Sequence, residues 1–320
     1  MIDKKQAISA MNQMGNDRVP FFFFTDFLGT KTWIKPISEI QPNEIEFDFI
    51  GANNQQLNEP FTLEKRPLSR DEFESSYQYV VDQINYGNSY LVNLTFKTPI
   101  ESNLSLEDIF HLSNAKYKVY FKDRFVVFSP ETFVKIKNGQ IFSYPMKGTI
   151  DASVPDAENV ILNDPKETAE HVTIVDLIRN DLSQVAERVN VTKFRFISEI
   201  KTHEKKLLQV SSEIVGKLPN DYPSKLGSII YKLLPAGSIS GAPKPETVRI
   251  IQKAETYERG FYTGICGHFD GETLDTGVMI RFIEKEGDQL YFKSGGGITS
   301  FSDLDKEYQE TIDKVYVPIH

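Results

Sequence analysis

The stretch DPKETAEHVTIVDLIRNDL, residues 164–182, guides the interpretation of the whole sequence, because it predicts one long helix with an acidic face. Asp164 suits the N-cap and Pro165 suits the first helical position, so we expect the helix to begin there. Glu167 and Glu170 are spaced i, i+3, which places both carboxylates on one side of the helix.

Helices and strands follow one another irregularly on both sides of this helix. Apolar stripes that begin at capping residues predict helices, and short apolar runs between turn residues predict strands. The predicted helices cover residues 68–87, 165–185, 222–233, 245–257 and 302–315. The predicted strands cover residues 19–24, 44–50, 89–96, 117–121, 125–128, 133–136, 141–144, 189–196, 207–215, 260–269, 275–283 and 290–293. Ser69 is the expected cap of helix 68–87, and Asp270-Gly271 predicts a hairpin turn between strands 260–269 and 275–283. This order favours the α+β class, with a large, mostly antiparallel sheet system in one domain, residues 1–320.

The composition is that of an ordinary globular protein with an acidic balance. The chain carries a net charge of −9 and one cysteine in 320 residues. The acidic balance argues against a nucleic-acid partner, and one cysteine cannot form an internal disulfide. The longest apolar run, residues 21–24, is too short to span a membrane, and the N-terminal residues lack the apolar core of a signal peptide. We therefore expect a cytoplasmic protein without a membrane partner.

A second acidic pair repeats the spacing of the first. Glu307 and Glu310 lie i, i+3 apart on the last predicted helix, as Glu167 and Glu170 do on the long one. Four carboxylates from two helices form an oxygen-rich set that suits Mg²⁺. A solvated helix face has the same composition, so the residues alone leave both interpretations open.

Two glycine-rich segments and one lysine also indicate a site. Residues 235–244, PAGSISGAPK, and residues 294–297, SGGG, each precede a predicted helix and could hold an anion with free N–H groups. Ordinary tight connections have similar sequences. Lys147 follows an apolar strand, and a confined lysine can act as a nucleophile, although most lysines are solvated.

Together these segments resemble the motifs of the chorismate-utilising enzymes, a family that includes anthranilate synthase component I, aminodeoxychorismate synthase component I, isochorismate synthase and salicylate synthase. Residues 164–182 resemble the family's D-x-K-E-x-x-E-H-x-x-x-V-D-L-x-R-N-D-L, and residues 235–244 resemble P-x-x-S/T-x-x-G-x-P-K. Residues 259–264, RGFYTG, are similar to R-G-x-Y-x-G. The resemblance implies two packed, mostly antiparallel sheets with surrounding helices. It places N-terminal strands in residues 1–65 and the family core in residues 86–316.

The resemblance also implies a metal site and a substrate site. By it, Mg²⁺ is held by Glu167, Glu170, Glu307 and Glu310 and binds the ring carboxylate of chorismate. The implied substrate-binding residues are Ser238, Tyr262, Arg281, Gly295, Gly297, Lys314, Gln209 and Thr149.

Lys147 indicates which member of the family the chain resembles. Residues 145–149, PMKGT, are similar to the P-I-K-G-T of aminodeoxychorismate synthases, whereas anthranilate synthases carry P-I-A-G-T. The resemblance implies that Lys147 attacks C2 of chorismate with loss of the 4-hydroxyl, before ammonia attacks C4. Glu131, in the S-P-E motif, is then the general acid. A nucleophilic amine must be neutral, so we expect the site to lower the pKa of Lys147.

Two residues depart from the family pattern. Leu91 replaces the glutamine usual in amino-transferring members, and isochorismate and salicylate synthases carry a general-base lysine there. Leu91 therefore argues against water as the nucleophile. Gln209 stands where the family often has histidine, which leaves its contact with the substrate open.

The resemblance implies that other proteins supply ammonia and process the product. Cys266 has no nucleophile elbow around it, so ammonia would come from a separate glutamine amidotransferase subunit. A separate lyase would turn 4-amino-4-deoxychorismate into 4-aminobenzoate for folate biosynthesis. The alternatives are anthranilate synthase component I, which aminates C2 in tryptophan biosynthesis, and a non-catalytic binding protein.

Overall fold

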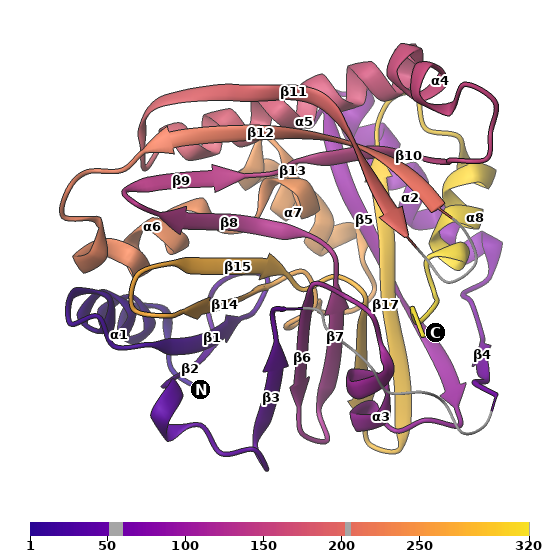
Figure 1. Ribbon diagram of the computed structural model, residues 1–320. Helices are drawn as coiled ribbons and strands as arrows, with labels where there is room; N and C mark the ends of the chain where they lie inside the picture. Colours follow the sequence, from indigo (N-terminus) through magenta and orange to yellow (C-terminus); the bar gives the residue numbers. More distant parts are fainter. Residues whose placement is uncertain (51–59, 202–205, 320) are drawn as a thin grey trace.

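The computed structural model describes residues 1–50, 60–201 and 206–319, and the fold is α+β, as the sequence predicts. Two antiparallel sheets run crosswise to each other, with helices around them (Figure 1). The nine-stranded sheet has the order β10-β12-β9-β8-β15-β14-β1-β2, with β11 paired to β12. Its strands are β1 (Phe21–Thr25), β2 (Thr32–Pro36), β8 (Thr132–Lys137), β9 (Gln140–Ser143), β10 (Met146–Asp151), β11 (Glu187–Lys201), β12 (Lys206–Lys217), β14 (Ile265–Phe269) and β15 (Leu274–Val278).

The eight-stranded sheet has the order β13-β5-β17-β16-β7-β6-β3, with β4 paired to β5. Its strands are β3 (Ile45–Asp48), β4 (Leu63–Lys65), β5 (Leu91–Ser102), β6 (Tyr117–Phe121), β7 (Phe125–Ser129), β13 (Gly241–Ala242), β16 (Phe282–Glu286) and β17 (Gln289–Ile298). The long strands β5 and β17 pair from Ile100↔Leu290 to Val92↔Ile298. This is the longest strand pair of the sheet.

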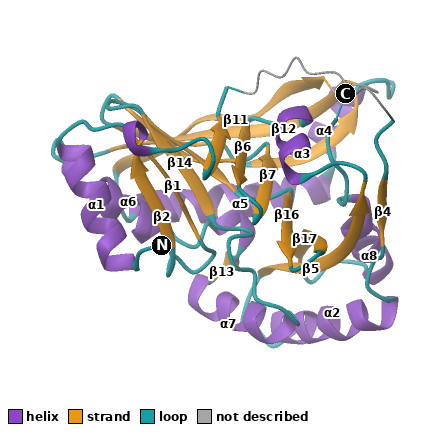
Figure 2. Cartoon of the chain, turned by 90° about the horizontal axis from the view of Figure 1, so that it is seen from below, coloured by secondary structure: helices purple, strands orange, loops and turns teal. Residues whose placement is uncertain are grey.

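The helices cover the outer faces of the sheets. In Figure 2, α2 and α7 lie together over β5, and α1 lies beside α6 at the other end of the molecule. The described helices are α1 (Lys4–Asn16), α2 (Arg70–Asn85), α3 (Leu106–Leu112), α4 (Ala157–Asn163), α5 (Pro165–Ser183), α6 (Leu226–Leu233), α7 (Lys244–Ala254) and α8 (Leu304–Asp313), with 3₁₀ turns η1 (Ile37–Glu39), η2 (Tyr222–Lys225) and η3 (Gly237–Ile239). No helix in the described ranges has both the length and the apolar character needed to cross a membrane.

The apolar core fills both faces of the nine-stranded sheet at β1. Phe21 and Phe23 belong to the large core cluster, whereas Phe22 and Phe24 face a second cluster around Trp33. Successive side chains of a strand point to opposite faces, so a strand covered on both sides has a continuous apolar sequence. The run of four phenylalanines therefore marks a strand buried on both faces.

Local signals place the starts of α2 and α5 as expected. Ser69 caps α2 in a capping box with Glu72, and the Asp164 side chain accepts a hydrogen bond from the Glu167 N–H at the start of α5. These caps satisfy N–H groups that have no partner within the helix. The predicted hairpin turn at Asp270 is also present, between β14 and β15.

The prediction that residues 1–65 form strands is wrong for the first of them, because residues 4–16 form α1. The signals were present in the sequence. Asp3 and Gln6 form a capping box, and Ala7, Met11 and Gly15 recur at intervals of four to face the core.

Two predicted strands near the C-terminus also differ from the structure. Residues 260–264 form a turn, and β14 begins at Ile265. The predicted strand 275–283 is two strands in different sheets, β15 and β16, because Arg281 has a φ of 55° and breaks the extended conformation.

The prediction that residues 294–297 form a turn before the last helix is wrong. Gly295, Gly296 and Gly297 lie inside β17 and pair with Thr95, Leu94 and Asn93. A Cβ at Gly295 would lie 2.2 Å from the Leu94 carbonyl oxygen, closer than any side chain allows. This glycine therefore permits β5 and β17 to approach closely.

Candidate active site

A cavity of about 210 Å³ lies where strands of both sheets meet α5. β5 and β17 of one sheet and β8 to β10 of the other contribute lining residues, together with the loop at η3. Eight of the predicted site residues line it: Glu131, Lys147, Ser238, Tyr262, Arg281, Gly295, Gly297 and Lys314. The cavity therefore brings together residues that are far apart in the sequence.

Lys147 lies at the start of β10 and faces carboxylates from two helices. Its Nζ is 2.6 Å from Oε2 of Glu170. Burial lowers the pKa of Lys147, but the negative charges of Glu170, Glu167 and Glu310 outweigh burial and raise the pKa above its ordinary value. The expectation of a lowered pKa is therefore wrong for the protein without a bound cation, because these carboxylates stabilise the ammonium form.

Three of the four predicted metal-binding glutamates, Glu167, Glu307 and Glu310, lie against glycines beside the cavity. Gly148 has a φ of 83°, and a Cβ there would lie 3.0 Å from Oε2 of Glu167. A Cβ at Gly296 would lie 3.4 Å from Oε2 of Glu307 and 3.8 Å from Oε1 of Glu310. The missing side chains leave room for carboxylates of α5 and α8, whose oxygens are the type of ligand that a hard divalent cation prefers.

Lys314 is the second ammonium group in this region. Its Nζ lies 2.6 Å from Oε1 of Glu310 and donates a hydrogen bond to the Gly295 carbonyl at 2.8 Å. Burial lowers the pKa of Lys314, and Glu310 opposes that effect. Lys147 and Lys314 thus each neutralise one carboxylate of the predicted metal set.

Glu131, in the connection between β7 and β8, is the carboxyl group with the conditions for acid catalysis. Ser238 Oγ donates a hydrogen bond to its Oε1 at 2.5 Å. Burial raises the pKa of Glu131, while Ser238, Arg281 and Lys314 act in the opposite direction, and the net shift is upward. A carboxyl group with a raised pKa stays protonated at higher pH, as a general acid must.

Arg281 and Tyr262 are two further polar residues that line the cavity. Arg281 lies where the chain crosses from one sheet to the other, and its guanidinium carbon is 5.3 Å from the centre of the Tyr316 ring. Tyr262 is buried, and burial raises the pKa of its hydroxyl, which stays protonated and able to donate a hydrogen bond. These two residues and Lys314 give the acidic chain a local site for anions.

Thr149 and Gln209 are not among the residues that line the cavity. They pair with each other across β10 and β12, and Thr149 is exposed. The register of this pair shifts between Met146 and Thr149. Such a bulge breaks the alternation of side chains, so Thr149 does not share the orientation of Lys147.

The sequence-based site omitted a buried ion pair at the cavity wall. Asp181 lines the cavity, and its Oδ2 lies 2.7 Å from Nζ of Lys244, which also donates to the Leu233 carbonyl. A buried charge needs a partner of opposite charge. Both residues stand in the quoted motifs, so the signal was available, but their pairing depends on the tertiary fold.

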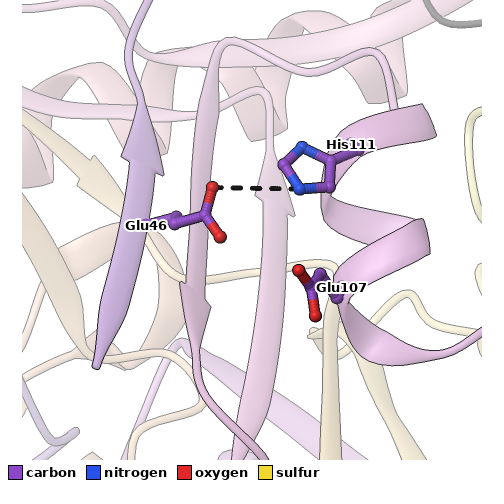
Figure 3. Close-up of side chains that lie close together, drawn as sticks. All are labelled: Glu46, Glu107 and His111. Atoms are coloured by element: carbon purple, nitrogen blue, oxygen red, sulfur yellow. Dashed lines mark ion pairs between the residues drawn. The ribbon is translucent and has the colours of Figure 1, made fainter. Parts of the chain in front are cut away.

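One group of metal-binding side chains elsewhere has closer spacing than the four glutamates. In the described part of the chain, only Glu46, Glu107 and His111 have ligand atoms that all lie within 4.8 Å of one another (Figure 3). The His111 Nε2 is 3.8 Å from Oε2 of Glu46. This group joins β3 to α3 and shares no residue with the cavity lining, so it has no part in the candidate active site.

Comparison with known proteins shows where this architecture recurs. The sequence model described as "chorismate binding enzyme" matches residues 35–320. An "Uncharacterized PabA-like protein" of Haemophilus influenzae is 50% identical over 315 residues, which cover 98% of this chain and 96% of that protein. "Aminodeoxychorismate synthase component 1" of Salmonella typhimurium is 30% identical over 269 residues, or 79% of this chain and 58% of that protein.

The fold also matches a solved structure. Anthranilate synthase component I from Streptococcus pneumoniae superposes with a TM-score of 0.68 at 28% sequence identity, covering 80% of this chain and 59% of that chain. The similar proteins therefore include one named aminodeoxychorismate synthase and one named anthranilate synthase.

Proposed function

Because this chain belongs to the chorismate binding enzyme family, we propose that it aminates chorismate at C4 to give 4-amino-4-deoxychorismate. The observation that carries the proposal is that Lys147 and Glu131 line one cavity. A lysine and a carboxyl group with a raised pKa are the nucleophile and the acid that this reaction needs.

In the first step, Lys147 Nζ in its neutral form bonds to C2 of the ring. The two ring double bonds shift, and the bond between C4 and its hydroxyl oxygen breaks. Glu131 gives its proton to the departing hydroxyl, which leaves as water. The raised pKa of Glu131 keeps that proton available, and the hydrogen bond from Ser238 fixes the carboxyl group.

In the second step, ammonia bonds to C4 and the double bonds return to their original positions. The bond between C2 and Lys147 Nζ breaks, which restores the free amine. Leu91, which lines the cavity, offers no base to activate water. This favours ammonia over water as the second nucleophile.

The cationic and hydrogen-bonding groups of the wall would hold the two carboxylates of chorismate. Arg281 can contact a carboxylate with two parallel hydrogen bonds, and Lys314 adds a point charge. Tyr262 and the backbone of Gly295 and Gly297 complete this wall. Binding through both carboxylates would orient the ring between Lys147 and Glu131.

Mg²⁺ is the proposed cofactor, held by Glu167, Glu170, Glu307 and Glu310. A cation there would bind the ring carboxylate and withdraw charge from the conjugated diene. With their charge taken up, these carboxylates would no longer stabilise the ammonium form of Lys147. Loading of the site would therefore lower the pKa of Lys147 toward the neutral amine that attacks C2.

A glutamine amidotransferase subunit is the proposed source of ammonia. Cys266, the only cysteine of the chain, is fully buried, and burial raises its pKa to about 12. Such a thiol does not form the thiolate that glutamine hydrolysis requires. A separate lyase would remove pyruvate from the product to give 4-aminobenzoate, a folate precursor.

Anthranilate synthesis is the second candidate function. It is favoured by the likeness to anthranilate synthase component I in fold and sequence. There ammonia attacks C2 directly, and the same protein eliminates pyruvate. Lys147 opposes this alternative, because in the proposed reaction this lysine itself attacks C2, the atom that ammonia would have to reach.

The deciding experiment identifies the product made from chorismate, Mg²⁺ and an ammonium salt, by chromatography and mass spectrometry. Our proposal expects 4-amino-4-deoxychorismate, and 4-aminobenzoate once an aminodeoxychorismate lyase is added. If anthranilate forms without an added lyase, the proposal is wrong and the chain is an anthranilate synthase. If chorismate remains unchanged, the result favours a non-catalytic protein that only binds chorismate.

A further inference from the structure

A buried ion pair lies directly behind the candidate active site and does not line its cavity. The side chains of Arg259 and Glu255 are each 2% exposed. Arg259 Nε donates to Oε2 of Glu255 at 2.9 Å, and its Nη2 donates to Oε1 at 2.7 Å. Glu255 Oε1 also accepts hydrogen bonds from the N–H and hydroxyl of Thr95 on β5. This carboxylate therefore fixes the plane of the guanidinium group.

The remaining N–H groups of Arg259 bind three separate segments. Nη2 donates to the Asn93 carbonyl on β5 at 2.6 Å, and Nη1 donates to the Ile239 carbonyl of η3 at 2.8 Å. Nη1 also donates to the Thr263 hydroxyl at 3.2 Å. One planar group thus joins a strand, a 3₁₀ turn and the turn before β14.

Each of these three segments carries a residue of the cavity wall. Asn93 lines the cavity itself, Ser238 precedes the Ile239 contact, and Tyr262 precedes the Thr263 contact. Ser238 is the donor to Glu131. Arg259 therefore binds two lining residues, Asn93 and Ile239, directly. Its contacts to Ile239 and Thr263 lie one residue from Ser238 and Tyr262, which line the cavity as well.

We propose that Arg259 is a positioning residue, which holds three walls of the chorismate cavity in register and so places Ser238 against Glu131. The guanidinium fork has five N–H donors in fixed directions, and this site uses three nitrogens on four partners. An ammonium group is a single point charge and cannot span the same carbonyls. Arg259→Lys therefore keeps the charge beside Glu255 and loses the alignment.

This inference rests on the proposed function only in that the cavity binds chorismate, so its test measures binding and not amination. Titration calorimetry gives the Kd for chorismate of the wild type, Arg259→Lys, Ser238→Ala and the double variant. We expect each single variant to bind at least about tenfold more weakly, since small misplacements of positioned groups are costly. The double variant should bind no more than about threefold more weakly than the weaker single variant, because both changes disturb the same wall.

Lys118→Gln provides the matched control. Lys118 is also buried and pairs with Asp48 at 3.3 Å, but it lies in β6 and does not line the cavity. We expect its thermal midpoint to fall and its Kd for chorismate to stay within twofold of the wild type. Two results would overturn the proposal. In the first, Arg259→Lys leaves the Kd for chorismate within twofold of the wild type, as the control does. In the second, the factor by which the Kd rises in the double variant equals the product of the factors for Arg259→Lys and Ser238→Ala.

A milder variant keeps the test decisive if Arg259→Lys does not fold. Glu255→Gln keeps an oxygen for Thr95 and removes the charge that orients Arg259. It should raise the Kd for chorismate about threefold to tenfold in the wild type. The same substitution should raise the Kd by a smaller factor when it is combined with Ser238→Ala. Unchanged binding in Glu255→Gln would contradict the positioning role. If the wild type does not aminate chorismate, the proposed function is wrong, but the Kd values still test the role of Arg259.

Discussion

At the scale of single residues, the site depends on ion pairs and hydrogen bonds between partly or fully buried groups. Lys147 faces Glu170 on one side of the cavity, and Glu131 faces Ser238, Arg281 and Lys314 on the other. The pKa of Lys147 is raised by its neighbours, and the pKa of Glu131 is raised by burial. The proposed reaction therefore starts from a protonated acid and requires the loss of one proton from the amine.

Glu131→Gln keeps the shape of the side chain and removes the acidic proton. We expect kcat to fall by about 10²- to 10⁴-fold, the usual contribution of a positioned general acid. Because burial raises the pKa of Glu131, the wild type should lose activity as the pH rises through that pKa and the acid becomes ionised. Steady-state rates measured from pH 5 to 9 check this, and the variant should lack that limb. A variant with the wild-type rate and pH profile would exclude Glu131 as the acid.

At the scale of elements, the best predicted parts of the chain are those specified by local signals. The caps of α2 and α5 and the hairpin turn at Asp270 depend on residues close in sequence, and all three are confirmed. The glycines of 295–297 could not be assigned to β17 in this way, because glycine is rare in strands and only the close approach of β5 explains it. The break at Arg281 depends on one backbone angle that no periodicity reveals.

The proposed metal-binding glutamates of α5 and α8 predict how turnover depends on Mg²⁺. Glu170→Gln and Glu310→Gln each remove one charge from the donor set, so the Mg²⁺ concentration for half-maximal activity should rise at least about tenfold. Glu158→Gln, on the exposed face of the neighbouring α4, is the matched control and should keep the wild-type value. Rates measured across a Mg²⁺ titration provide the test. Equal curves for all four proteins would remove these glutamates from the metal site.

The buried face of α5 predicts a pH dependence of stability. His171 hydrogen-bonds Ser212 of β12 at 2.7 Å, and burial together with the charge of Arg195 lowers the pKa of His171 from 6.5 to about 4. The unfolded chain then binds the proton more readily, so this contribution is present above pH 6.5 and is lost as the pH falls toward 4. From pH 7 to pH 5, the free energy of unfolding should drop by about 2 kcal/mol on this account. Urea unfolding at pH 7 and pH 5 gives the free energy of unfolding of the wild type and of His171→Gln. An equal drop in both proteins would show that His171 does not cause the pH dependence.

At the scale of the whole molecule, the two sheets run crosswise to each other (Figure 1). Residues of both sheets line the cavity, and the chain changes sheets at Glu131 and Arg281, which also line it. The α+β class could be predicted from the irregular order of elements, and the motif residues from their resemblance to a family. The contacts that decide their chemistry could not be predicted. Asp181 meets Lys244, and Lys147 meets Glu170, only through the folding of distant segments.

The whole chain should use ammonium salts as the nitrogen source and fail with glutamine. The reason is that its only cysteine, Cys266, is buried in β14 and has a raised pKa. Addition of a glutamine amidotransferase subunit should restore activity with glutamine. Rates with each nitrogen source, with and without that subunit, check the prediction. Cys266→Ser should behave like the wild type in all of these assays, and glutamine-dependent turnover by the chain alone would contradict the proposal.

The amination of chorismate by Lys147→Ala tests the central claim most directly. The variant is incubated with chorismate, Mg²⁺ and an ammonium salt, and both aminated products are quantified, with the exposed Lys253→Ala as the matched control. If Lys147 is the covalent nucleophile, formation of 4-amino-4-deoxychorismate falls at least about 100-fold, and any remaining amination shifts to C2. The control keeps the wild-type rate and product. A Lys147→Ala variant that makes 4-amino-4-deoxychorismate at the wild-type rate would contradict the covalent mechanism.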